Sequence, residues 1–303
     1  MKKTLLSIGV AVETDLSNIN KQEISTLQDL LYKNRIIVIK NNELTEKQFC
    51  DFAHLMGEPI PYLQKNYNHP EHDLIFVSSN VKQGSTQKIG VPRTGGYWHS
   101  DTAFEEDPKL ITMLMPKILP LKSPRTTRFI DMSSVYKNLP LHLKNAIEDV
   151  EFLHSGRYKY KVRPEDVGLD VSEILEMIDY IQAPVAHPAV ITHPYTKEKI
   201  IYASRGFTIG IKNKGLDESK KVLNELFDFA EQQEFVKEIQ WEKGDLIIWD
   251  NRFLAHSSGR KKAPTDDIHV EVSKEEETMM YRITLKDGLP LTEEKKIYCN
   301  NNN

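Results

Sequence analysis

The sequence predicts a mainly β protein with flanking helices, arranged as an antiparallel β-sandwich or jelly roll. Three observations favour this class. Short apolar runs of strand length recur along the chain, the helical patterns between them are few, and strands and helices do not alternate as they would around a parallel sheet. The 303 residues contain no internal repeat and no linker whose composition differs from its flanks. We therefore expect one domain over residues 1–303.

The N-terminal region predicts a strand at 5–12, an amphipathic helix at 21–33 and a β-branched strand at 36–39. Thr45 and Gln48 form a capping-box pattern, which indicates a helix that ends at Gly57. The further elements expected are, in order, strands at 74–79, 110–119 and 127–131, a helix at 139–150, a strand at 153–163, a helix at 167–180, a strand at 200–208, a helix at 220–231, and strands at 246–249 and 278–285.

Composition narrows the class of protein. Forty lysine and arginine residues against 44 aspartate and glutamate residues give a net charge of -4, which argues against a nucleic-acid partner. The chain contains no apolar run long enough to span a bilayer, and its two cysteines argue against a disulfide framework. We expect a cytoplasmic protein, and we leave open whether it forms a homo-oligomer.

The segment 95–104 contains a His-x-Asp pair, His99 and Asp101. In an extended segment residues i and i+2 point to the same face, so the imidazole and the carboxylate converge. Such a pair can supply two ligands of a two-histidine, one-carboxylate metal site. Taken alone the His-x-Asp pattern is a weak indication of a metal site, because a surface loop with a helix-capping aspartate can contain the same pattern.

A second segment supplies the missing ligand. The strand expected at 246–249 is broken at 250–251, and His256 follows on the next extended piece. A histidine on a separate strand is what a facial triad needs as its third ligand. His187 and His193 are rivals for this role. Each precedes a proline, which favours extended geometry, and we interpret both as structural histidines.

The strand expected at 278–285 carries a lone arginine, Arg282. Arg282 shares a face with Met280 and Thr284, and an arginine in such a position is costly to bury unless it meets an anion. A guanidinium can grip a carboxylate with two parallel hydrogen bonds. Arg260 lies nearer to His256 and is a rival anchor, but it opens a basic loop rather than lying within a strand.

Taken together, segments 98–101, 249–252 with His256, and 281–284 resemble the TauD/TfdA family of iron(II)- and 2-oxoglutarate-dependent dioxygenases. The resemblance extends over nearly the whole chain and implies a double-stranded β-helix core of the cupin-like kind. It implies that Fe(II) is bound by His99, Asp101 and His256, and that O2 is the oxidant.

The same resemblance implies that Thr127 and Arg282 hold the distal carboxylate of the co-substrate 2-oxoglutarate, with Thr126 as an alternative register. One departure is the gap between His256 and Arg282, which is longer than the family usually has. The extra residues lie in a charged insertion at 261–277.

The family acts mostly on small acids. We expect a carboxylate-bearing, amino-acid-derived substrate, and Asp101 favours hydroxylation, desaturation or a related oxidation over halogenation. Segments 96–101 and 202–208 resemble members found in isocyanide biosynthesis. Taurine- or alkylsulfonate-type and aryloxyalkanoate-type dioxygenases are alternatives, as is a non-catalytic metal-binding cupin-like protein. The candidate substrate residues are the counter-ions Arg157, Lys159 and Arg205 and the walls Tyr62, Tyr97 and Phe104.

Overall fold

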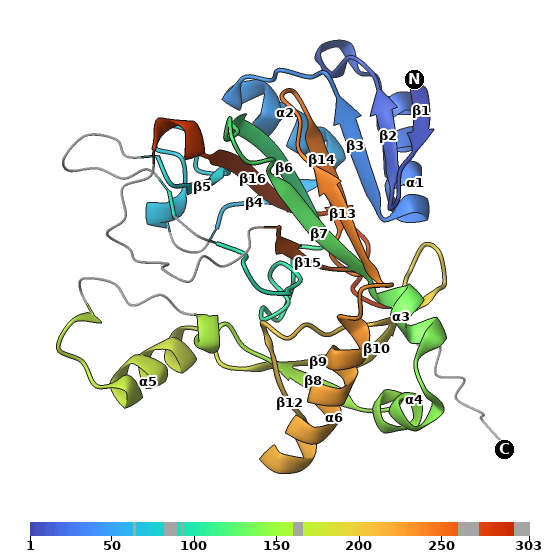
Figure 1. Ribbon diagram of the computed structural model, residues 1–303, viewed down its shortest axis with the longest axis vertical. Coiled ribbons are helices and arrows are strands. Elements are labelled where there is room, and N and C mark those ends of the chain that lie inside the picture. The colour runs from blue at the N-terminus through green and yellow to red at the C-terminus, as the bar shows by residue number, and fades with distance from the viewer. Residues whose placement is uncertain (63–64, 82–89, 92–93, 160–165, 260–272, 294–303) are drawn as a thin grey trace, which may run out of the picture.

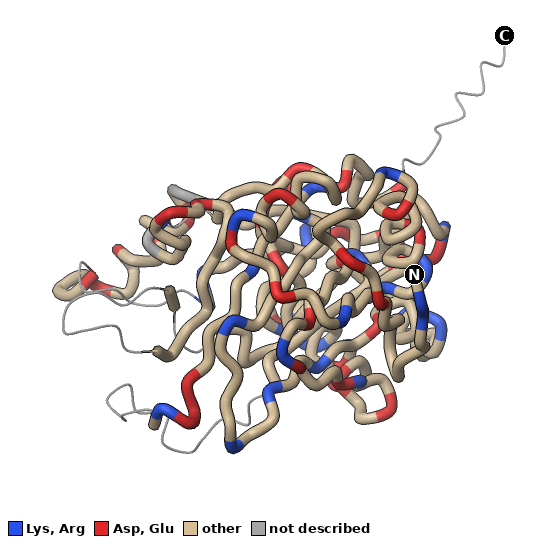
Figure 2. The backbone as a smooth tube through the Cα atoms, turned by 90° about the horizontal axis from the view of Figure 1, so that it is seen from above, with Lys and Arg blue, Asp and Glu red and all other residues tan. Residues whose placement is uncertain are grey.

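A computed structural model describes residues 1–62, 65–81, 90–91, 94–159, 166–259 and 273–293 of the chain (Figure 1). The protein is mainly β with some helices, as the sequence predicts. Basic and acidic positions are interspersed along the described backbone (Figure 2). In the described residues no helix is long and apolar enough to cross a membrane.

The largest sheet has eight strands in the order β1-β2-β3-β14-β6-β16-β4, and β5 also pairs with β16. All its described pairings are antiparallel except that of β2 with β3. The strands are β1 (Lys2–Leu5), β2 (Val10–Glu13), β3 (Ile36–Lys40), β4 (Glu58–Ile60), β5 (Phe76–Ser79), β6 (Ile111–Ile118), β14 (Leu246–Asp250) and β16 (Met279–Lys286).

Both faces of this sheet are covered. In β14 the side chains of Ile247 and Trp249 enter one hydrophobic core, whereas Leu246 and Ile248 enter another. Period-two alternation therefore divides one wholly apolar run between two cores, which is why the run at 246–249 lacks a polar face.

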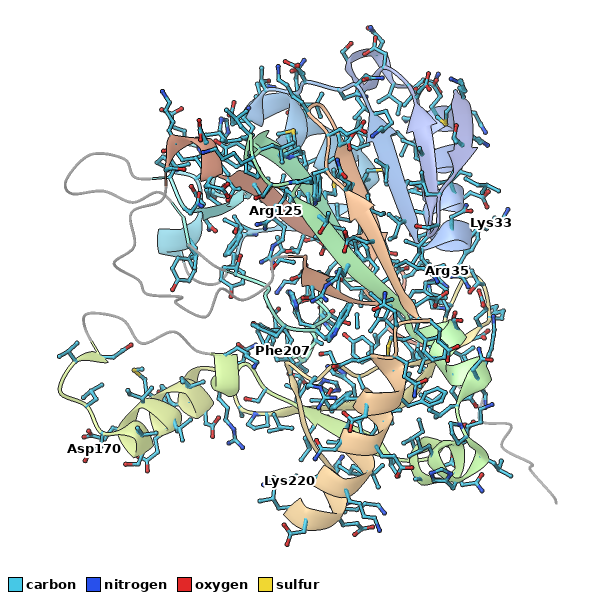
Figure 3. The ribbon with its side chains drawn as sticks, viewed as in Figure 1. Lys33, Arg35, Arg125, Asp170, Phe207 and Lys220 are labelled. Carbon is cyan, nitrogen blue, oxygen red and sulfur yellow. The ribbon has the colours of Figure 1, made fainter. Side chains whose placement is uncertain are left out.

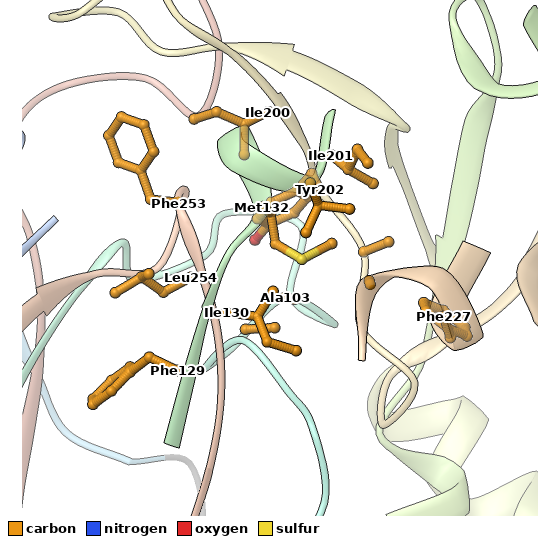
Figure 4. Close-up of a cluster of buried hydrophobic side chains, with 14 of the residues drawn as sticks. Ala103, Phe129, Ile130, Met132, Ile200, Ile201, Tyr202, Phe227, Phe253 and Leu254 are labelled. Atoms are coloured by element: carbon orange, nitrogen blue, oxygen red, sulfur yellow. The ribbon is translucent and has the colours of Figure 1, made fainter. Parts of the chain in front are cut away.

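Three smaller sheets complete the β structure, with the orders β13-β7-β15, β12-β8-β9 and β10-β11. The first shares with the largest sheet the core that contains Phe129, Trp249 and Leu254. Figure 4 shows part of this core, including Phe129 and Leu254. The strands are β7 (Thr126–Asp131), β8 (Glu151–His154), β9 (Val185–Pro188), β10 (Val190–Thr192), β11 (Lys199–Ile201), β12 (Thr208–Ile211), β13 (Val236–Gln240) and β15 (Leu254–Ser258).

The helices begin where capping residues allow. Thr45 and Gln48 form the expected capping box at the start of α2, and Asn20 with Glu23 forms another at the start of α1. The apolar faces of α1 and α2 pack on the largest sheet. The helices are α1 (Lys21–Asn34), α2 (Glu46–Met56), α3 (Met132–Asn138), α4 (Leu141–Ile147), α5 (Val171–Ile181) and α6 (Leu216–Ala230).

Three expected strands are wrong in their extent. The strand at 5–12 is two strands, β1 and β2, because Leu6 N donates to Gly9 O at 3.1 Å and Gly9 has a φ of 82°. The strand at 153–163 ends at His154, and Arg157–Lys159 forms a 3-10 helix; residues 160–165 lie outside the described part. The strand at 200–208 is β11 and β12 joined by a turn.

A buried ion cluster around Arg252 connects the end of β14 to the segment that follows β16. Arg252 Nη1 lies 3.1 Å from Asp250 Oδ2, and Arg252 Nη2 lies 2.9 Å from Asp287 Oδ1. His193 Nε2 contacts the same oxygen, Asp250 Oδ2, at 3.0 Å, and Tyr32 Oη donates to Asp287 Oδ2 at 2.8 Å. These four contacts fix the backbone that follows Trp249 and precedes His256.

His154 should make the protein sensitive to mild acid. Burial lowers the pKa of His154 to about 3, and neighbouring His187, whose ring lies 5.4 Å away, acts in the same direction. The unfolded chain gains a proton near pH 6.5 and the folded chain does not, so stability is full above pH 6.5 and falls as pH drops toward 3. Between pH 7.5 and 5.5 this histidine should account for a loss of about 1.4 kcal/mol.

Urea unfolding of the wild-type protein and of His154→Leu at both pH values measures this difference. The variant should lose less stability on acidification, whatever its absolute stability. Equal losses would show that His154 titrates normally in the folded protein.

Candidate metal centre

A short antiparallel bridge brings His99 and His256 together. His99 N donates to His256 O at 3.0 Å, and His256 N donates to His99 O at 2.7 Å. A further backbone hydrogen bond joins the same two segments, since Ser258 N donates to Gly95 O at 2.7 Å. Because the two residues face each other directly, their ring centroids lie only 4.2 Å apart.

Asp101 completes the group from a turn. The expected extended geometry ends at the bridge of His99, and Asp101 is followed by Thr102 with a φ of 57°. This turn carries Asp101 back toward the two rings: Oδ1 lies 3.8 Å from His99 Nε2, and Oδ2 lies 3.7 Å from His256 Nε2. The candidate ligand atoms of the three residues all lie within 4.8 Å of one another, and all three residues are buried.

The hydrogen-bond pattern fits a metal ion. His99 Nδ1 lies 2.8 Å from the carbonyl oxygen of Tyr97, and a carbonyl only accepts, so Nδ1 carries the proton. This tautomer leaves the lone pair of His99 Nε2 directed at the cluster, as metal ligation requires. Trp249 packs edge-on against His256, with ring centroids 4.8 Å apart, and limits its rotation.

Electrostatics keep the group in the ligating protonation state. Burial lowers the pKa of His99 and lowers the pKa of His256 to about 3, so both imidazoles are neutral. Burial alone would raise the pKa of Asp101, but the charge of Arg282 and the other neighbours bring it down to about 2. Two neutral imidazoles and one carboxylate are the donor set of a two-histidine, one-carboxylate iron site.

A chain of side chains orients the carboxylate. Thr112 Oγ1 donates to Asp101 Oδ2 at 2.8 Å, and Asn251 Nδ2 donates to Thr112 Oγ1 at 2.8 Å. Asn251 Oδ1 in turn accepts from Trp249 Nε1 at 2.9 Å. Every member is buried, so the carboxylate has one preferred orientation.

Replacing Thr112 with valine should weaken metal binding about 10- to 100-fold, because the hydroxyl that fixes Asp101 is lost while the shape is kept. Equilibrium titration of the metal-free protein with Mn(II) measures the change. Thr284→Val, also on the largest sheet but outside this chain of hydrogen bonds, serves as the control. Unchanged Mn(II) affinity in Thr112→Val would contradict the positioning role.

A cavity extends from the three residues between the largest sheet and the β13-β7-β15 sheet. It is lined by His99, Asp101 and His256, and also by Thr127, Arg282 and Arg125. Figure 3 labels Arg125 among the side chains of the protein. Phe76, Leu114, Trp249 and Met280 contribute apolar walls. The structure thus brings together the five residues expected for metal and co-substrate, and Thr127 rather than Thr126 faces the cavity.

Arg282 lies directly beside the candidate ligands. Its Nη1 contacts Asp101 Oδ1 at 2.6 Å, and its guanidinium lies over the rings of Phe76, at 4.3 Å, and Tyr62, at 5.6 Å. The expected alternation of β16 is confirmed, since Tyr281 and Ile283 enter the core on the opposite face. Arg260 lies outside the described residues, as does most of the insertion at 261–277.

The expected aromatic walls surround the metal residues without lining the cavity itself. The Tyr97 ring lies 5.0 Å from the His99 ring, and Phe104 packs on Phe207, whose ring lies 5.8 Å from His99. Lys159 Nζ lies 4.5 Å from the Tyr97 ring centroid. Tyr97 therefore packs directly against His99, and Phe104 packs on the ring next to it.

Two expected counter-ions are directed elsewhere, and this corrects their assignment. Arg205 pairs with Asp228 of α6 and with Glu231, the residue that caps this helix, both at 2.7 Å, because the expected strand is a turn at this point. Arg157 lies 3.3 Å from Asp179 of α5. Neither arginine is among the described residues that line the cavity.

The rival histidines are structural, as expected. His187 Nε2 contacts the carbonyl oxygen of Glu105 at 2.9 Å, and His193 belongs to the ion cluster around Asp250.

The sequence did not reveal two residues of the site: Arg125, which lines the cavity, and Trp241, which contacts Thr127. Arg125 just precedes the expected strand at 127–131, and nothing in its sequence context separates it from the other basic residues of that region.

Comparison with known families and proteins agrees with this geometry. The family model described as taurine catabolism dioxygenase TauD, TfdA family, matches residues 3–270. The chain is 26% identical over 253 residues to the alpha-ketoglutarate-dependent 2,4-dichlorophenoxyacetate dioxygenase of Cupriavidus pinatubonensis, covering 78% of this chain and 83% of that one. It is 25% identical to the alkylsulfatase of Acinetobacter baylyi, covering 79% and 73%.

Among solved structures, AAD-2 in complex with Mn(II) and N-oxalylglycine superposes with a TM-score of 0.75 at 23% identity, covering 97% of this chain and all of that one. This likeness concerns the fold. Fold and candidate site together define an iron-dependent oxygenase. The chain belongs to the TauD/TfdA family of dioxygenases, enzymes that use Fe(II), 2-oxoglutarate and O2.

Proposed function

We propose that His99, Asp101 and His256 hold the iron, and that the distal carboxylate of 2-oxoglutarate lies against Thr127 and Arg282. The observation that carries this proposal is a buried two-histidine, one-carboxylate group at the base of a cavity that contains both of these residues. When bound, iron with 2-oxoglutarate and O2 supplies the oxidation, and the co-substrate is converted to succinate and carbon dioxide.

The chain itself contributes binding, orientation and a restricted environment. Thr112 and Asn251 hold Asp101 in one orientation, and Tyr97 O holds the His99 ring through Nδ1. Burial keeps the two imidazoles neutral, so no proton must leave them when metal binds. Apolar walls, including Phe76 and Met280, would limit the access of bulk water to the reacting centre.

We propose a small carboxylate-bearing, amino-acid-derived substrate, with isocyanide biosynthesis as the pathway class. The cavity is lined by two guanidiniums, Arg282 and Arg125, and is therefore suited to anionic ligands. Tyr62, Tyr97 and Phe104 would provide aromatic walls. Two similar proteins are named for a carboxylate, 2,4-dichlorophenoxyacetate, and for alkyl sulfates, so aryloxyalkanoate-type and alkylsulfate- or alkylsulfonate-type acids are the alternative substrates. Family membership does not support the non-catalytic alternative.

A panel of acids tests this proposal. Succinate formation by the Fe(II) protein with 2-oxoglutarate is measured with N-substituted amino acids, taurine, an alkyl sulfate and an aryloxyacetate, each beside its neutral amide or alcohol. We expect the amino-acid-derived carboxylates to stimulate turnover most and their amides not at all. Preferential stimulation by the sulfate or the aryloxyacetate would overturn this substrate class while leaving the co-substrate site intact.

We further propose that the β13-β7-β15 sheet and the largest sheet form a double-stranded β-helix core within a single domain over 1–303. We also propose a cytoplasmic location, which cell fractionation tests, and a homo-oligomeric state, which analytical ultracentrifugation tests.

A further inference from the structure

We propose that Arg125 and Trp241 complete the binding site for the distal carboxylate of 2-oxoglutarate. Arg125 supplies a second guanidinium, and Trp241 is a positioning residue that fixes the hydroxyl of Thr127 as a hydrogen-bond donor. The inference rests on the proposed function, because it presumes that the co-substrate occupies the cavity beside Thr127.

Trp241 controls the direction of the Thr127 hydroxyl. Trp241 Nε1 lies 2.9 Å from Thr127 Oγ1, and both residues are buried. An indole N–H can only donate, so Thr127 Oγ1 must accept in this contact. The hydroxyl hydrogen is then left to donate to an acceptor in the cavity, which is what binding a carboxylate oxygen requires.

Arg125 is held at the same place by the same tryptophan. Trp241 N donates to the Arg125 carbonyl oxygen at 2.8 Å, and β13 pairs with β7 immediately beyond, with Ile239 opposite Thr127. Arg125 and Thr127 are two residues apart and both line the cavity, as expected for neighbours on one face of an extended segment. Trp241 therefore fixes both the backbone position of Arg125 and the orientation of the Thr127 hydroxyl.

Arg282 already has one anionic partner in the structure. Its guanidinium contacts Asp101, one of the candidate metal ligands, and lies over the ring of Phe76. In 2-oxoglutarate two methylene groups separate the chelating atoms from the distal carboxylate, so that carboxylate lies away from the metal ligands. Arg125 and Thr127 contact none of those ligands through a described hydrogen bond, so they are suited to hold that carboxylate together with Arg282.

Isothermal titration of the Mn(II)-loaded protein with two probes separates the two ends of the co-substrate. N-oxalylglycine, in which an N–H replaces one methylene of 2-oxoglutarate, keeps the distal carboxylate, whereas oxalate has only the chelating end. Arg125→Met should weaken N-oxalylglycine binding about 30-fold and Trp241→Phe about tenfold, with oxalate affinity unchanged in both. Arg128→Met, which removes the same charge from β7 outside the cavity lining, should change neither affinity by more than about twofold.

A double-variant cycle tests how Trp241 acts. In a Thr127→Val background the Trp241→Phe change should cause no further loss, because the hydroxyl that it positions is gone. Equal losses in both backgrounds, or parallel losses for N-oxalylglycine and oxalate, would overturn the positioning role of Trp241. Unchanged N-oxalylglycine affinity in Arg125→Met would overturn the role of Arg125. Failure of the wild-type protein to bind N-oxalylglycine would instead contradict the proposed function itself.

Discussion

His256→Ala is expected to abolish stoichiometric Fe(II) binding and to reduce succinate formation about a thousandfold. The variant removes one of three protein donors, and the remaining pair, His99 and Asp101, contribute only two ligand atoms. Because His256 contacts His99 through backbone groups, the bridge that aligns the site survives the loss of the imidazole. The loss therefore reports ligation rather than unfolding.

Metal content after anaerobic reconstitution, succinate formation and thermal melting are the measurements. His142→Ala is the matched control, because His142 is exposed and pairs only with Glu225 of α6 among its described contacts. A His256→Ala protein with full iron content and near wild-type turnover would show that another residue is the third ligand.

Arg252→Met should lower the free energy of unfolding by about 3–5 kcal/mol. The Arg252 side chain is fully buried and contacts both Asp250 and Asp287, and it also donates to the carbonyl oxygens of Leu289 and Pro290. Removing it leaves two buried carboxylates without their cation. Asp250 adjoins Trp249 and Asn251, which support the metal residues. We therefore expect the metal site to be lost in the same transition in which the whole protein unfolds.

Urea unfolding of wild-type and variant protein measures this effect. Lys197→Met provides the comparison, because its ion pair with Glu293 is exposed and should be worth less than about 1 kcal/mol. A loss below 1 kcal/mol in Arg252→Met would show that the cluster is not a major source of stability.

The sequence predicts well those features that are encoded locally. The capping box at Thr45, the alternation around Arg282 and the fully apolar run at 246–249 each depend on residues close together in the chain, and the structure has all three. The placement of Thr127 on the cavity side of β7 follows from the same period-two rule.

Features that depend on tertiary contacts were not predictable. The strand expected at 153–163 ends at His154, because alternation of basic and aromatic residues does not reveal where sheet pairing stops. Arg205 pairs with Asp228 and Glu231 at the C-terminal end of α6, more than twenty residues away. The roles of Thr112, Asn251 and Trp241 rest on contacts between segments distant in sequence, so no local pattern marks them.

The pairing of His99 with His256 was predictable only in part. Residue type and order identify both histidines as metal ligands by family resemblance, but their proximity depends on a backbone bridge between residues 157 positions apart. The geometry of Asp101 also departs from the expected strand, since a turn with Thr102 at positive φ brings the carboxylate to the rings.

Anaerobic ultraviolet–visible titration of the Fe(II) protein with 2-oxoglutarate tests the central claim most directly. We expect a weak charge-transfer band in the green that saturates with one co-substrate per iron, is absent in His99→Ala and requires more 2-oxoglutarate in Arg282→Ala. No band from fully metallated wild-type protein would contradict the assignment of the co-substrate to this centre. A normal band in His99→Ala would contradict the ligand set.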